Sequence, residues 1–300
     1  MSEDRKLSLR SKGSKSDVRL TVGLYLVATP IGNARDITLR ALDILASVDK
    51  IYAEDTRVSA KLLAIHALSR PLHSYREHNA QTADLKILEE LGRGLSIALI
   101  SDAGSPLISD PGQSLVESAG DNGFKVFPIP GPSAAVAALT ASGLPATQFF
   151  FAGFLPPKEN ERRRAIRELA AIPSTLIFYE APSRLLETLK DLQAILGDRQ
   201  SVIARELTKL HEEILRRPLA ALIAEYEQRA QVRGEIVILV APPAGENTTA
   251  ADEDEIDQML LRYLQTHPVK EAAAIVAAEM GLPRRTVYAR ALVLKKSNES

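Results

Sequence analysis

The chain has 300 residues, of which 45% are hydrophobic and 25% charged, and its formal net charge is −1. That length suits about two ordinary domains. No segment reaches the roughly 18 apolar residues of a membrane helix, and the first residues contain no apolar signal core, so we expect a cytoplasmic protein with no membrane partner. The balanced charge excludes a protein that is basic all over, and contact with nucleic acid therefore requires local basic patches.

The sequence contains no cysteine, which excludes disulfides, thiolate metal sites and cysteine nucleophiles. Its five histidines lack a metal-ligand spacing such as His-Glu-x-x-His. We therefore expect no metal.

The first half of the chain alternates apolar runs with amphipathic stretches. Residues 1–21 are rich in Ser, Lys and Arg and poor in apolar residues, which predicts a flexible basic tail. Residues 22–132 follow as an N-terminal domain. Its expected strands are 24–28, 51–53, 97–100 and 125–129, and its expected helices are 37–48, a stretch after Val58, 80–91 and 114–121. Strand followed by helix, repeated, predicts a mostly parallel sheet covered on both faces.

The second half, residues 133–241, predicts another α/β domain, whose sheet we expect to be mixed. Its expected strands are 149–151, 175–179, 202–204, 213–215 and 236–240, and its expected helices are 161–170, 183–196 and 219–229. Residues 242–254 are rich in Pro, Gly and polar residues, which predicts a linker. Residues 255–300 then form a small helical domain, with helices expected at 256–264, 270–280 and 284–294.

Four loops of the predicted first sheet are rich in Gly, Pro, Ser, Asp and Asn: residues 29–33, 54–57, 101–112 and 130–134. Such residues let the backbone approach a ligand and cap the next helix, although they also dominate ordinary turns. In an open parallel sheet these loops gather at the ligand-binding edge. Because neither a phosphate loop nor a Gly-x-Gly-x-x-Gly fingerprint is present, a ligand without phosphates is favoured.

Six strings carry a specific resemblance: LVATPIGN (26–33), AEDTR (53–57), LISDAGSPLISDPG (99–112), FPIPG (127–131), FYEAPSR (178–184) and ARELTK (204–209). In this order they resemble the motifs of the ribosomal RNA small subunit methyltransferase I family, a branch of the tetrapyrrole methylases, over about residues 22–240. The resemblance implies two α/β domains with S-adenosylmethionine in the cleft between them, and a homodimer. It also implies 2′-O-methylation of a cytidine in the decoding region of small-subunit (16S) rRNA.

The same resemblance implies which residues line the cofactor. They are Pro30, Asp102, Ala103, Gly104, Ser105, Pro106, Leu107, Ile108, Ser133, Ala134, Tyr179, Glu180, Ala181 and Pro182. One departure concerns Arg217 and Pro218, which stand where the family usually has glycine. We expect the hairpin there to be altered.

A ribose hydroxyl needs a group that accepts or polarises its proton. Glu54, Asp55 and Arg57 are the candidates, because they follow a buried strand at the ligand edge. A carboxylate could take the proton while Arg57 orients it or binds a phosphate, but a purely structural Asp–Arg pair is an equal alternative. His78 and Asn79 form a weaker alternative.

Two basic clusters are candidates for RNA contact. Lys158, Arg162, Arg163 and Arg164 follow a loop that lies beside the cleft in this family, and we predict that they contact phosphates. Arg284 and Arg285 begin a segment that resembles the second helix of a helix-turn-helix, with Gly281 in the turn. Solvated helix faces are the ordinary interpretation of such clusters.

Two other functions compete with RNA methylation. One is the same scaffold acting on a tetrapyrrole or a protein side chain, against which the string EDTR (54–57) favours the RNA-modifying branch. The other is a non-catalytic RNA-binding assembly factor, in which we would expect degraded cofactor loops. The loops are intact here.

Overall fold

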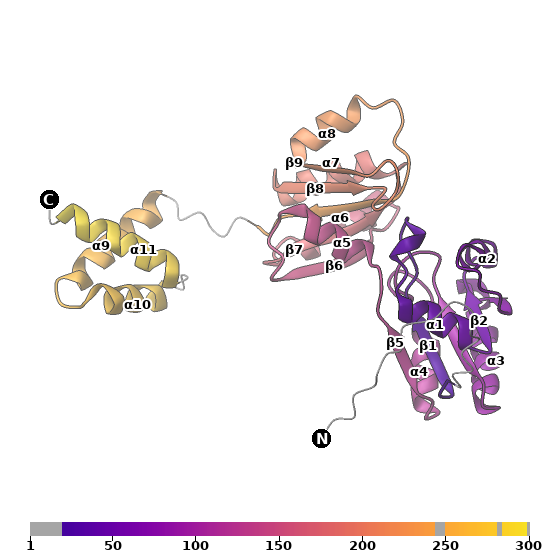
Figure 1. Cartoon of the computed structure of the whole chain (residues 1–300). Coiled ribbons are helices and arrows are strands. Elements are labelled where there is room, and N and C mark those ends of the chain that lie inside the picture. The colour runs from indigo at the N-terminus through magenta and orange to yellow at the C-terminus, as the bar shows by residue number, and fades with distance from the viewer. Residues whose placement is uncertain (1–19, 244–249, 281–283, 299–300) are drawn as a thin grey trace, which may run out of the picture. The chain divides into compact units, whose positions relative to one another are not determined.

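The computed structural model describes residues 20–243, 250–280 and 284–298. The chain separates into two compact units, Met1–Pro243 and Ala244–Ser300 (Figure 1). The tail predicted at 1–21 lies outside the described residues up to residue 19, as do residues 244–249 of the predicted linker and the turn at 281–283.

The first sheet contains β1 (Gly23–Val27), β2 (Lys50–Ala53), β3 (Leu72–Ser74), β4 (Ser96–Ile100) and β5 (Val126–Ile129). The strands are all parallel, in the order β3-β2-β4-β1-β5. The helices between them are η1 (Ala34–Asp36), α1 (Leu39–Ser47), α2 (Thr56–Ile65), η2 (Glu77–Asn79), α3 (Ala80–Gly92) and α4 (Gln113–Asp121). The predicted parallel sheet is confirmed, and β3 is an additional edge strand.

Side chains of the first sheet alternate between its two faces, and each face is buried. Tyr25 and Val27 pack with Leu45 of α1 on one face. Leu24 and Leu26, which alternate with them along the strand, pack with Ile87 of α3 and Leu115 of α4 on the other. Helices therefore cover both faces, which leaves the strand ends as the exposed edges of this sheet.

The second sheet is mixed, as predicted. It contains β6 (Phe149–Phe154), β7 (Thr175–Glu180), β8 (Gln200–Arg205), β9 (Glu213–Pro218) and β10 (Ile236–Val240), in the order β6-β7-β10-β8-β9. Only β6 and β7 pair in parallel; β10 runs antiparallel to β7 and β8, and β9 antiparallel to β8.

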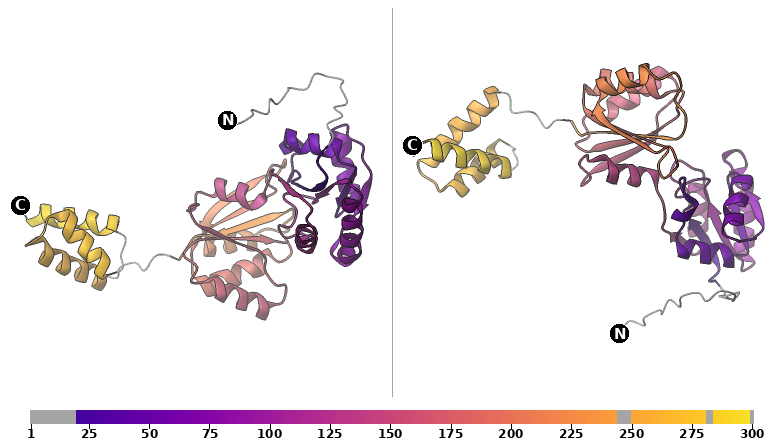
Figure 2. Two further views of the ribbon diagram at one scale, coloured as in Figure 1. Left: turned by 90° about the horizontal axis from the view of Figure 1, so that it is seen from below. Right: turned by 45° about the horizontal axis from the view of Figure 1, so that its top comes forward.

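Helices cover both faces of the second sheet as well (Figure 2). On one face α5 (Ala134–Ser142) buries Ala138 and Leu139 against the strands. On the other face lie α6 (Glu159–Leu169), α7 (Leu185–Leu196) and α8 (Leu219–Glu227), all of which contribute to one core cluster. The sequence predicted the last three helices; it indicated α5 only through the loop at 130–134, whose residue types can cap a following helix.

The hairpin expected to be altered at Arg217 and Pro218 is regular. The β8–β9 ladder stays in register from Arg205 opposite Glu213 to Gln200 opposite Pro218. Pro218 has a φ of −57° and precedes the first residue of α8 directly. Because proline has no N–H to donate to the ladder, it ends the strand and starts the helix without a loop. That expectation was wrong.

The second unit contains α9 (Ala250–Leu264), α10 (Val269–Glu279) and α11 (Arg284–Asn298). Leu260, Val276, Val287 and Ala291 form its core. Residues 250–254 are helical although the composition predicted a linker, since polar composition alone does not oppose the high helix propensity of alanine. Among the described residues of the whole chain, no helix is long and apolar enough to span a bilayer.

Candidate functional site

A cavity of about 380 Å³ lies in the first unit and is lined by residues from both sheets. The first wall, as we call it, comes from the loops after β1 and β4; its members are Ile31, Asp102, Ala103, Gly104, Ser105, Ile108, Ser109 and Asp110. The second wall comes from α5 and the second sheet; its members are Ser133, Ala134, Phe154, Tyr179, Glu180, Ala181, Pro182, Ala204, Leu207, Gly234, Glu235, Ile236 and Val237.

Backbone hydrogen bonds tie the two loops of the first wall together. Thr29 N donates to Gly104 O at 2.9 Å, and Gly104 N donates back to Thr29 O at 3.0 Å. The Ser101 hydroxyl also donates to Gly104 O, at 3.0 Å. Gly104 has a φ of +81°, a conformation that favours glycine. The loop after β4 is therefore held against the loop after β1 at a fixed turn.

Farther along the same loop, two residues with side chains adopt left-handed backbone conformations. The φ of Leu107 is +71° and that of Ser109 is +65°. Leu107 packs against the core cluster beneath the sheet, whereas Ile108, Ser109 and Asp110 line the cavity. Strained backbone of this kind concentrates at functional sites, where the surrounding structure holds it in place.

The second wall begins where β7 ends. The Glu180 carboxylate is buried, and it accepts hydrogen bonds from Ala181 N at 2.7 Å and from the Thr188 hydroxyl at 2.6 Å. Burial raises the pKa of the neighbouring Tyr179 hydroxyl. Ser133 precedes α5 and makes no side-chain cap hydrogen bond to it, so its hydroxyl is available at the cavity.

The charge on the cavity lining has one sign. The residues of both walls include the carboxylates Asp102, Asp110, Glu180 and Glu235, but no Lys, Arg or His. Such a lining attracts a cationic ligand and repels phosphate. It agrees with the phosphate-free ligand that the loops predicted.

The structure divides the three candidate catalytic residues. Asp55 caps α2: its carboxylate accepts from Arg57 N at 2.9 Å, from Nε at 3.0 Å and from Nη2 at 2.6 Å. These bonds to Arg57 hold the pKa of Asp55 well below its usual value. A carboxylate saturated in this way is a weak base, so the geometry matches the structural alternative for the Asp55–Arg57 pair.

Glu54 and Asp110 are the better-placed carboxylates. Both line a smaller pocket that adjoins the main cavity at Asp110. Burial and the negative charge of Asp102 raise the pKa of Glu54. Burial and the charge of Glu54 raise the pKa of Asp110 to about 6. Asp110 lies within the string LISDAGSPLISDPG (99–112), but the sequence analysis did not name it as a candidate base. Glu54 comes close to it because β2, which precedes Glu54, pairs with β4, which precedes the loop of Asp110.

The weaker pair, His78 and Asn79, lies outside both pockets. His78 is exposed, and the Asn79 amide oxygen accepts a hydrogen bond from Arg76 N at 2.7 Å. That bond is a local turn contact, so neither residue is placed near the cavity.

Most of the predicted cofactor-side residues line the cavity. Three do not: Pro106 lines the smaller pocket, Leu107 packs in the core, and Pro30 adjoins Ile31, which does line it. The sequence missed Ile31, Ser109, Asp110, Phe154, Ala204, Leu207, Gly234, Glu235, Ile236 and Val237. Several of these belong to ordinary apolar strands, which carry no local signal of a site.

The basic cluster on α6 is only partly on the surface. Lys158 and Arg164 are exposed, with side-chain exposures of 78% and 75%. Arg162 is 3% exposed; its Nε lies 2.7 Å from Asp191 and its Nη1 donates to Pro157 O at 3.1 Å. A guanidinium buried this far cannot reach a phosphate, so the prediction that Arg162 contacts RNA was wrong.

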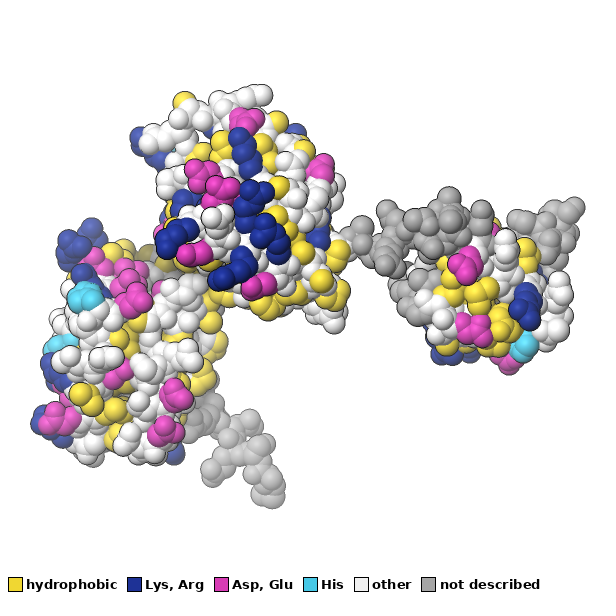
Figure 3. Space-filling model, turned by 180° about the vertical axis from the view of Figure 1, so that it is seen from behind, with side chains coloured by type: hydrophobic (Ala, Val, Ile, Leu, Met, Phe, Trp, Pro, Cys, Tyr) yellow, Lys and Arg dark blue, Asp and Glu magenta, His cyan; other side chains and the backbone are white. Residues whose placement is uncertain are grey.

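Arg163 is intermediate, since it is 36% exposed and lies 3.1 Å from Glu159 and 3.6 Å from Asp191. Figure 3 shows Lys and Arg side chains, interspersed with Asp and Glu, gathered over the part of the chain that carries the second sheet. In the second unit Arg284 is exposed, whereas the side chain of Arg285 lies outside the described residues.

The chain combines a parallel and a mixed α/β sheet with a cavity between their loops. Its match to a known family identifies the class of protein. Residues 23–223 match the family described as Tetrapyrrole (Corrin/Porphyrin) Methylases, and residues 250–295 match the RsmI C-terminal HTH domain. The chain belongs to the tetrapyrrole methylase family and is a methyltransferase.

Among its relatives, the chain is 48% identical over 280 residues to Ribosomal RNA small subunit methyltransferase I of Mesorhizobium japonicum, which covers 93% of this chain and 94% of that protein. It is 43% identical over 286 residues to the protein of the same name from Bacillus subtilis, over 93% and 96% of the two chains.

Two solved structures share the fold. A crystal structure of diphthine synthase aligns with a TM-score of 0.59 at 14% identity, over 73% of this chain and 89% of that one. Uroporphyrin-III C-methyl transferase from Thermus thermophilus, complexed with S-adenosyl homocysteine, aligns with a TM-score of 0.53 at 20% identity, over 73% and 97%. The predicted fold class is thereby confirmed.

Proposed function

We propose that this protein transfers a methyl group from S-adenosylmethionine to the 2′-oxygen of a cytidine ribose in the decoding region of small-subunit rRNA, in the cytoplasm. The observation that carries the methyl donor is the cavity whose charged lining residues are all carboxylates. The RNA acceptor is supported by the relatives, which are named as methyltransferases of small-subunit ribosomal RNA. Cytidine and the decoding region rest on the resemblance of the six motifs.

The cavity fits the proposed donor. Its volume of about 380 Å³ lies within the range of about 300–1,000 Å³ that is usual for small-molecule sites. Asp102 and Asp110 suit a sulfonium and an ammonium group, whereas Glu180 and Glu235 are already paired with Arg184 and Lys209. The lining residues include no cation for a phosphate. The residues that would hold the donor are Asp102 to Ser105 and Ile108 on the first wall, and Ser133, Ala134 and Tyr179 to Pro182 on the second. S-adenosylmethionine supplies an activated methyl group.

The protein's own task is to place the ribose hydroxyl and to take its proton. Orientation alone contributes up to about 7–11 kcal/mol in favourable cases. Asp110 lines the cavity, and its pKa of about 6 makes it a stronger base than an ordinary aspartate while it stays ionised at pH 7.5. We assign the proton to Asp110, whose pKa is raised in part by Glu54.

The other sequence candidates take supporting roles. Asp55 caps α2 and fixes Arg57 beside the site. The Arg57 side chain is 81% exposed, which suits contact with a phosphate of the substrate. Lys158, Arg163 and Arg164 on α6, with Arg284 on α11, supply further phosphate contacts that position the RNA without reading its sequence.

A homodimer is part of this proposal. β6 is an edge strand of the second sheet, and Phe149 and Phe150 at its start are 47% and 41% exposed. An edge strand with exposed aromatic side chains is ready to associate unless something covers it. A second copy of the chain would cover it around a two-fold axis. The molar mass measured by light scattering tests this. A monomer at micromolar concentration would refute the dimer but would leave the proposed methyl transfer unaffected.

The experiment that tests the function measures transfer of labelled methyl from S-adenosylmethionine to small ribosomal subunits from cells that lack this protein. Label recovered as 2′-O-methylcytidine after digestion is the expected result. Label in another nucleoside would refute the specificity but keep the reaction. Binding of S-adenosylhomocysteine without any transfer to subunits or to naked rRNA would refute the RNA acceptor and direct the search to tetrapyrroles and proteins.

A further inference from the structure

An irregularity in β6 turns one phenylalanine toward the cavity. Pairing with β7 runs from Phe149 to Phe151 in register and then shifts, so that Gly153 lies opposite Phe178 and Phe154 opposite Tyr179. Paired residues of neighbouring strands point to the same face. Without the extra residue, Phe154 would point to the opposite face. Bulges that redirect a side chain are over-represented beside active sites.

Gly153 makes this bulge possible. Its φ is +66°, and a Cβ at this position would lie 3.2 Å from the Ser109 hydroxyl of the first wall. The bulge thus places the backbone of β6 directly against the strained loop of the first wall. Phe154 follows at the cavity, where it is 55% exposed.

The Phe154 ring is supported on one side. Its centroid lies 5.6 Å from that of Tyr179 in an edge-to-face arrangement, and Tyr179 itself contacts Phe151 edge-to-face at 4.9 Å. Edge-to-face contacts of this kind stabilise a ring orientation without covering both of its faces. Phe154 lines the cavity and keeps more than half of its surface exposed.

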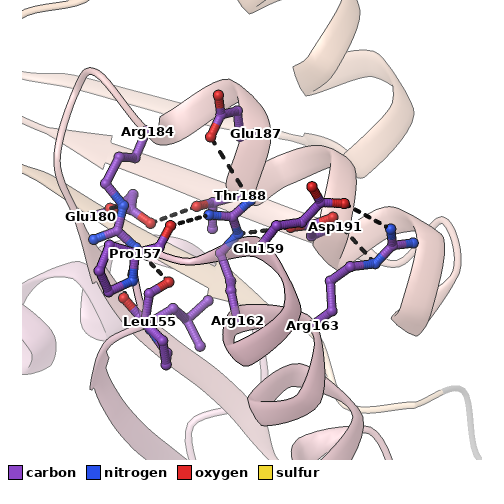
Figure 4. A network of polar contacts seen from close by, with 11 residues as sticks. Leu155, Pro157, Glu159, Arg162, Arg163, Glu180, Arg184, Glu187, Thr188 and Asp191 are labelled. Atoms are coloured by element: carbon purple, nitrogen blue, oxygen red, sulfur yellow. Dashed lines mark hydrogen bonds and ion pairs between the residues drawn. The ribbon is translucent and has the colours of Figure 1, made fainter.

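Two arginines hold the chain directly after Phe154. Arg184 Nη2 donates to Leu155 O at 2.6 Å and to Pro156 O at 3.1 Å. Arg162 Nη1 donates to the next carbonyl, that of Pro157, at 3.1 Å. Figure 4 shows both guanidinium groups reaching this short segment, Arg184 from the start of α7 and Arg162 from α6. Three successive carbonyls are therefore fixed by side chains rather than by the sheet.

Both arginines are themselves anchored. Arg184 Nε lies 3.4 Å from the buried Glu180 carboxylate, whose second oxygen accepts from Thr188 at 2.6 Å. Arg162 Nε lies 2.7 Å from Asp191. We call this network, made of Glu180, Arg184, Thr188, Arg162 and Asp191, the arginine clamp. A rigid backing of this kind places an aromatic ring far more precisely than a loop alone.

The distribution of charge around Phe154 decides which part of an RNA chain can contact its ring. The cavity lining carries carboxylates, which repel a phosphate, whereas Lys158 and Arg164 lie exposed on α6, beginning four residues after Phe154. An RNA chain that lays its phosphates on α6 would present a base, and no charge, to the ring. Proteins that bind single-stranded nucleic acid combine a positively charged surface for the phosphates with aromatic side chains on which the bases stack.

We propose that Phe154 is the stacking platform for the unstacked target base, and that the arginine clamp holds it in position. The inference rests on the proposed function, because it needs RNA as substrate. It assigns Phe154 to substrate binding, and Arg184 to positioning.

The test compares Phe154→Ala, Phe154→Leu and Phe154→Tyr with Leu85→Ala, an exposed apolar residue on α3 that lines neither pocket. Removing a stacked base contact weakens binding by about 10- to 100-fold. We expect that reduction in kcat/KM for RNA with Ala and with Leu, carried by KM. The Tyr variant keeps a π-face and should remain close to wild type. Binding of S-adenosylhomocysteine, measured by calorimetry, should not change in any variant.

Three outcomes would overturn the assignment. Full activity of Phe154→Leu would make the residue a simple apolar wall, and a loss of S-adenosylhomocysteine binding equal to the loss for RNA would place the ring against the donor. Dissociation of a Phe154 variant from dimer to monomer would make the residue part of the subunit interface. Arg184→Lys, which removes the Nη2 group that donates to two carbonyls, should raise KM for RNA without changing the circular dichroism spectrum. If wild-type protein methylates no RNA, the proposed function itself fails, independently of these variants.

Discussion

The two walls of the cavity are built in different ways. The first wall is nearly continuous in the chain, with members from Asp102 to Asp110 and one residue after β1, and backbone bonds such as Thr29 to Gly104 hold it. The second wall gathers residues between Ser133 and Val237 and depends on the arginine clamp. One wall is thus specified by local sequence and the other by tertiary contacts, and substitutions should separate these two kinds of support.

Asp110→Asn tests the chemistry of the first wall and carries the largest expected effect. Removing a general base lowers kcat by about 10²- to 10⁴-fold, whereas S-adenosylhomocysteine should bind as before, since the side chain keeps its shape. In the wild type, kcat/KM should fall as the pH drops below about 6, where Asp110 becomes protonated.

Asp55→Asn is the matched control, because asparagine caps a helix as well as aspartate does. It should retain most of the activity. If Asp55→Asn lost as much activity as Asp110→Asn, the assignment of the proton to Asp110 would be refuted.

Arg162→Ala tests the support of the second wall. The change leaves Asp191, whose side chain is 11% exposed, without its 2.7 Å partner, and breaking a buried pair typically costs about 3–5 kcal/mol. Chemical denaturation should show this decrease in the free energy of unfolding. Arg164→Ala on the same helix removes a 4.0 Å surface pair and should cost at most about 1 kcal/mol. Equal decreases in the two variants would contradict the distinction.

The surface outside the second wall should respond to salt. In Lys158→Gln/Arg164→Gln, the slope of log affinity for RNA against log salt should become shallower by about 0.7 for each phosphate that the variant no longer neutralises. The double variant Lys86→Gln/Lys125→Gln, which changes two exposed lysines of the first-sheet half, should leave the slope unchanged. A slope unaffected by either pair would remove α6 from the RNA surface.

The smallest effect concerns stability and pH. The folded-state pKa of Asp110, about 6, lies above its ordinary value of 3.8. The ionised carboxylate therefore destabilises the fold above pH 6, and this penalty disappears as the pH falls from about 6 to 3.8. Asp110→Asn should be more stable than wild type at pH 7.5 by about 1 kcal/mol, allowing for partial solvent screening. The difference should vanish near pH 4; a difference that persists there would point to another cause.

Sequence alone predicted the regular parts of the fold because burial leaves a periodic trace. The buried runs of β1, β4 and β10 are unmistakable, since every residue of β4 and β10 is buried. β3 escaped because its three residues are at most half-buried at an edge, which leaves no alternation to detect.

The candidate site was predictable only where it is local. Residues 102–105 stood out through their composition, whereas Ile236 and Val237 read as an ordinary strand and join the cavity only through the antiparallel placement of β10. Arg162 shows the converse. It sits among four arginines of a helix that looks solvated, and only the packing of α7 against α6 reveals that one of them is internal.

The approach of the loop after β1 to the loop after β8 has a mechanical consequence. A methyl group at Gly32 would lie 2.6 Å from Lys209 Cγ and from Thr208 Oγ1, and 2.7 Å from Leu207 O. Asn33 N also donates to Thr208 Oγ1 at 3.0 Å. The two halves of the first unit therefore already touch at this point, which acts as a stop: a ligand that is too small cannot draw the walls closer here. Because Gly32 has no side chain, its backbone approaches Thr208 and Lys209 this closely, and a larger residue at position 32 would push the two loops apart beside Ile31 and Leu207, which line the cavity.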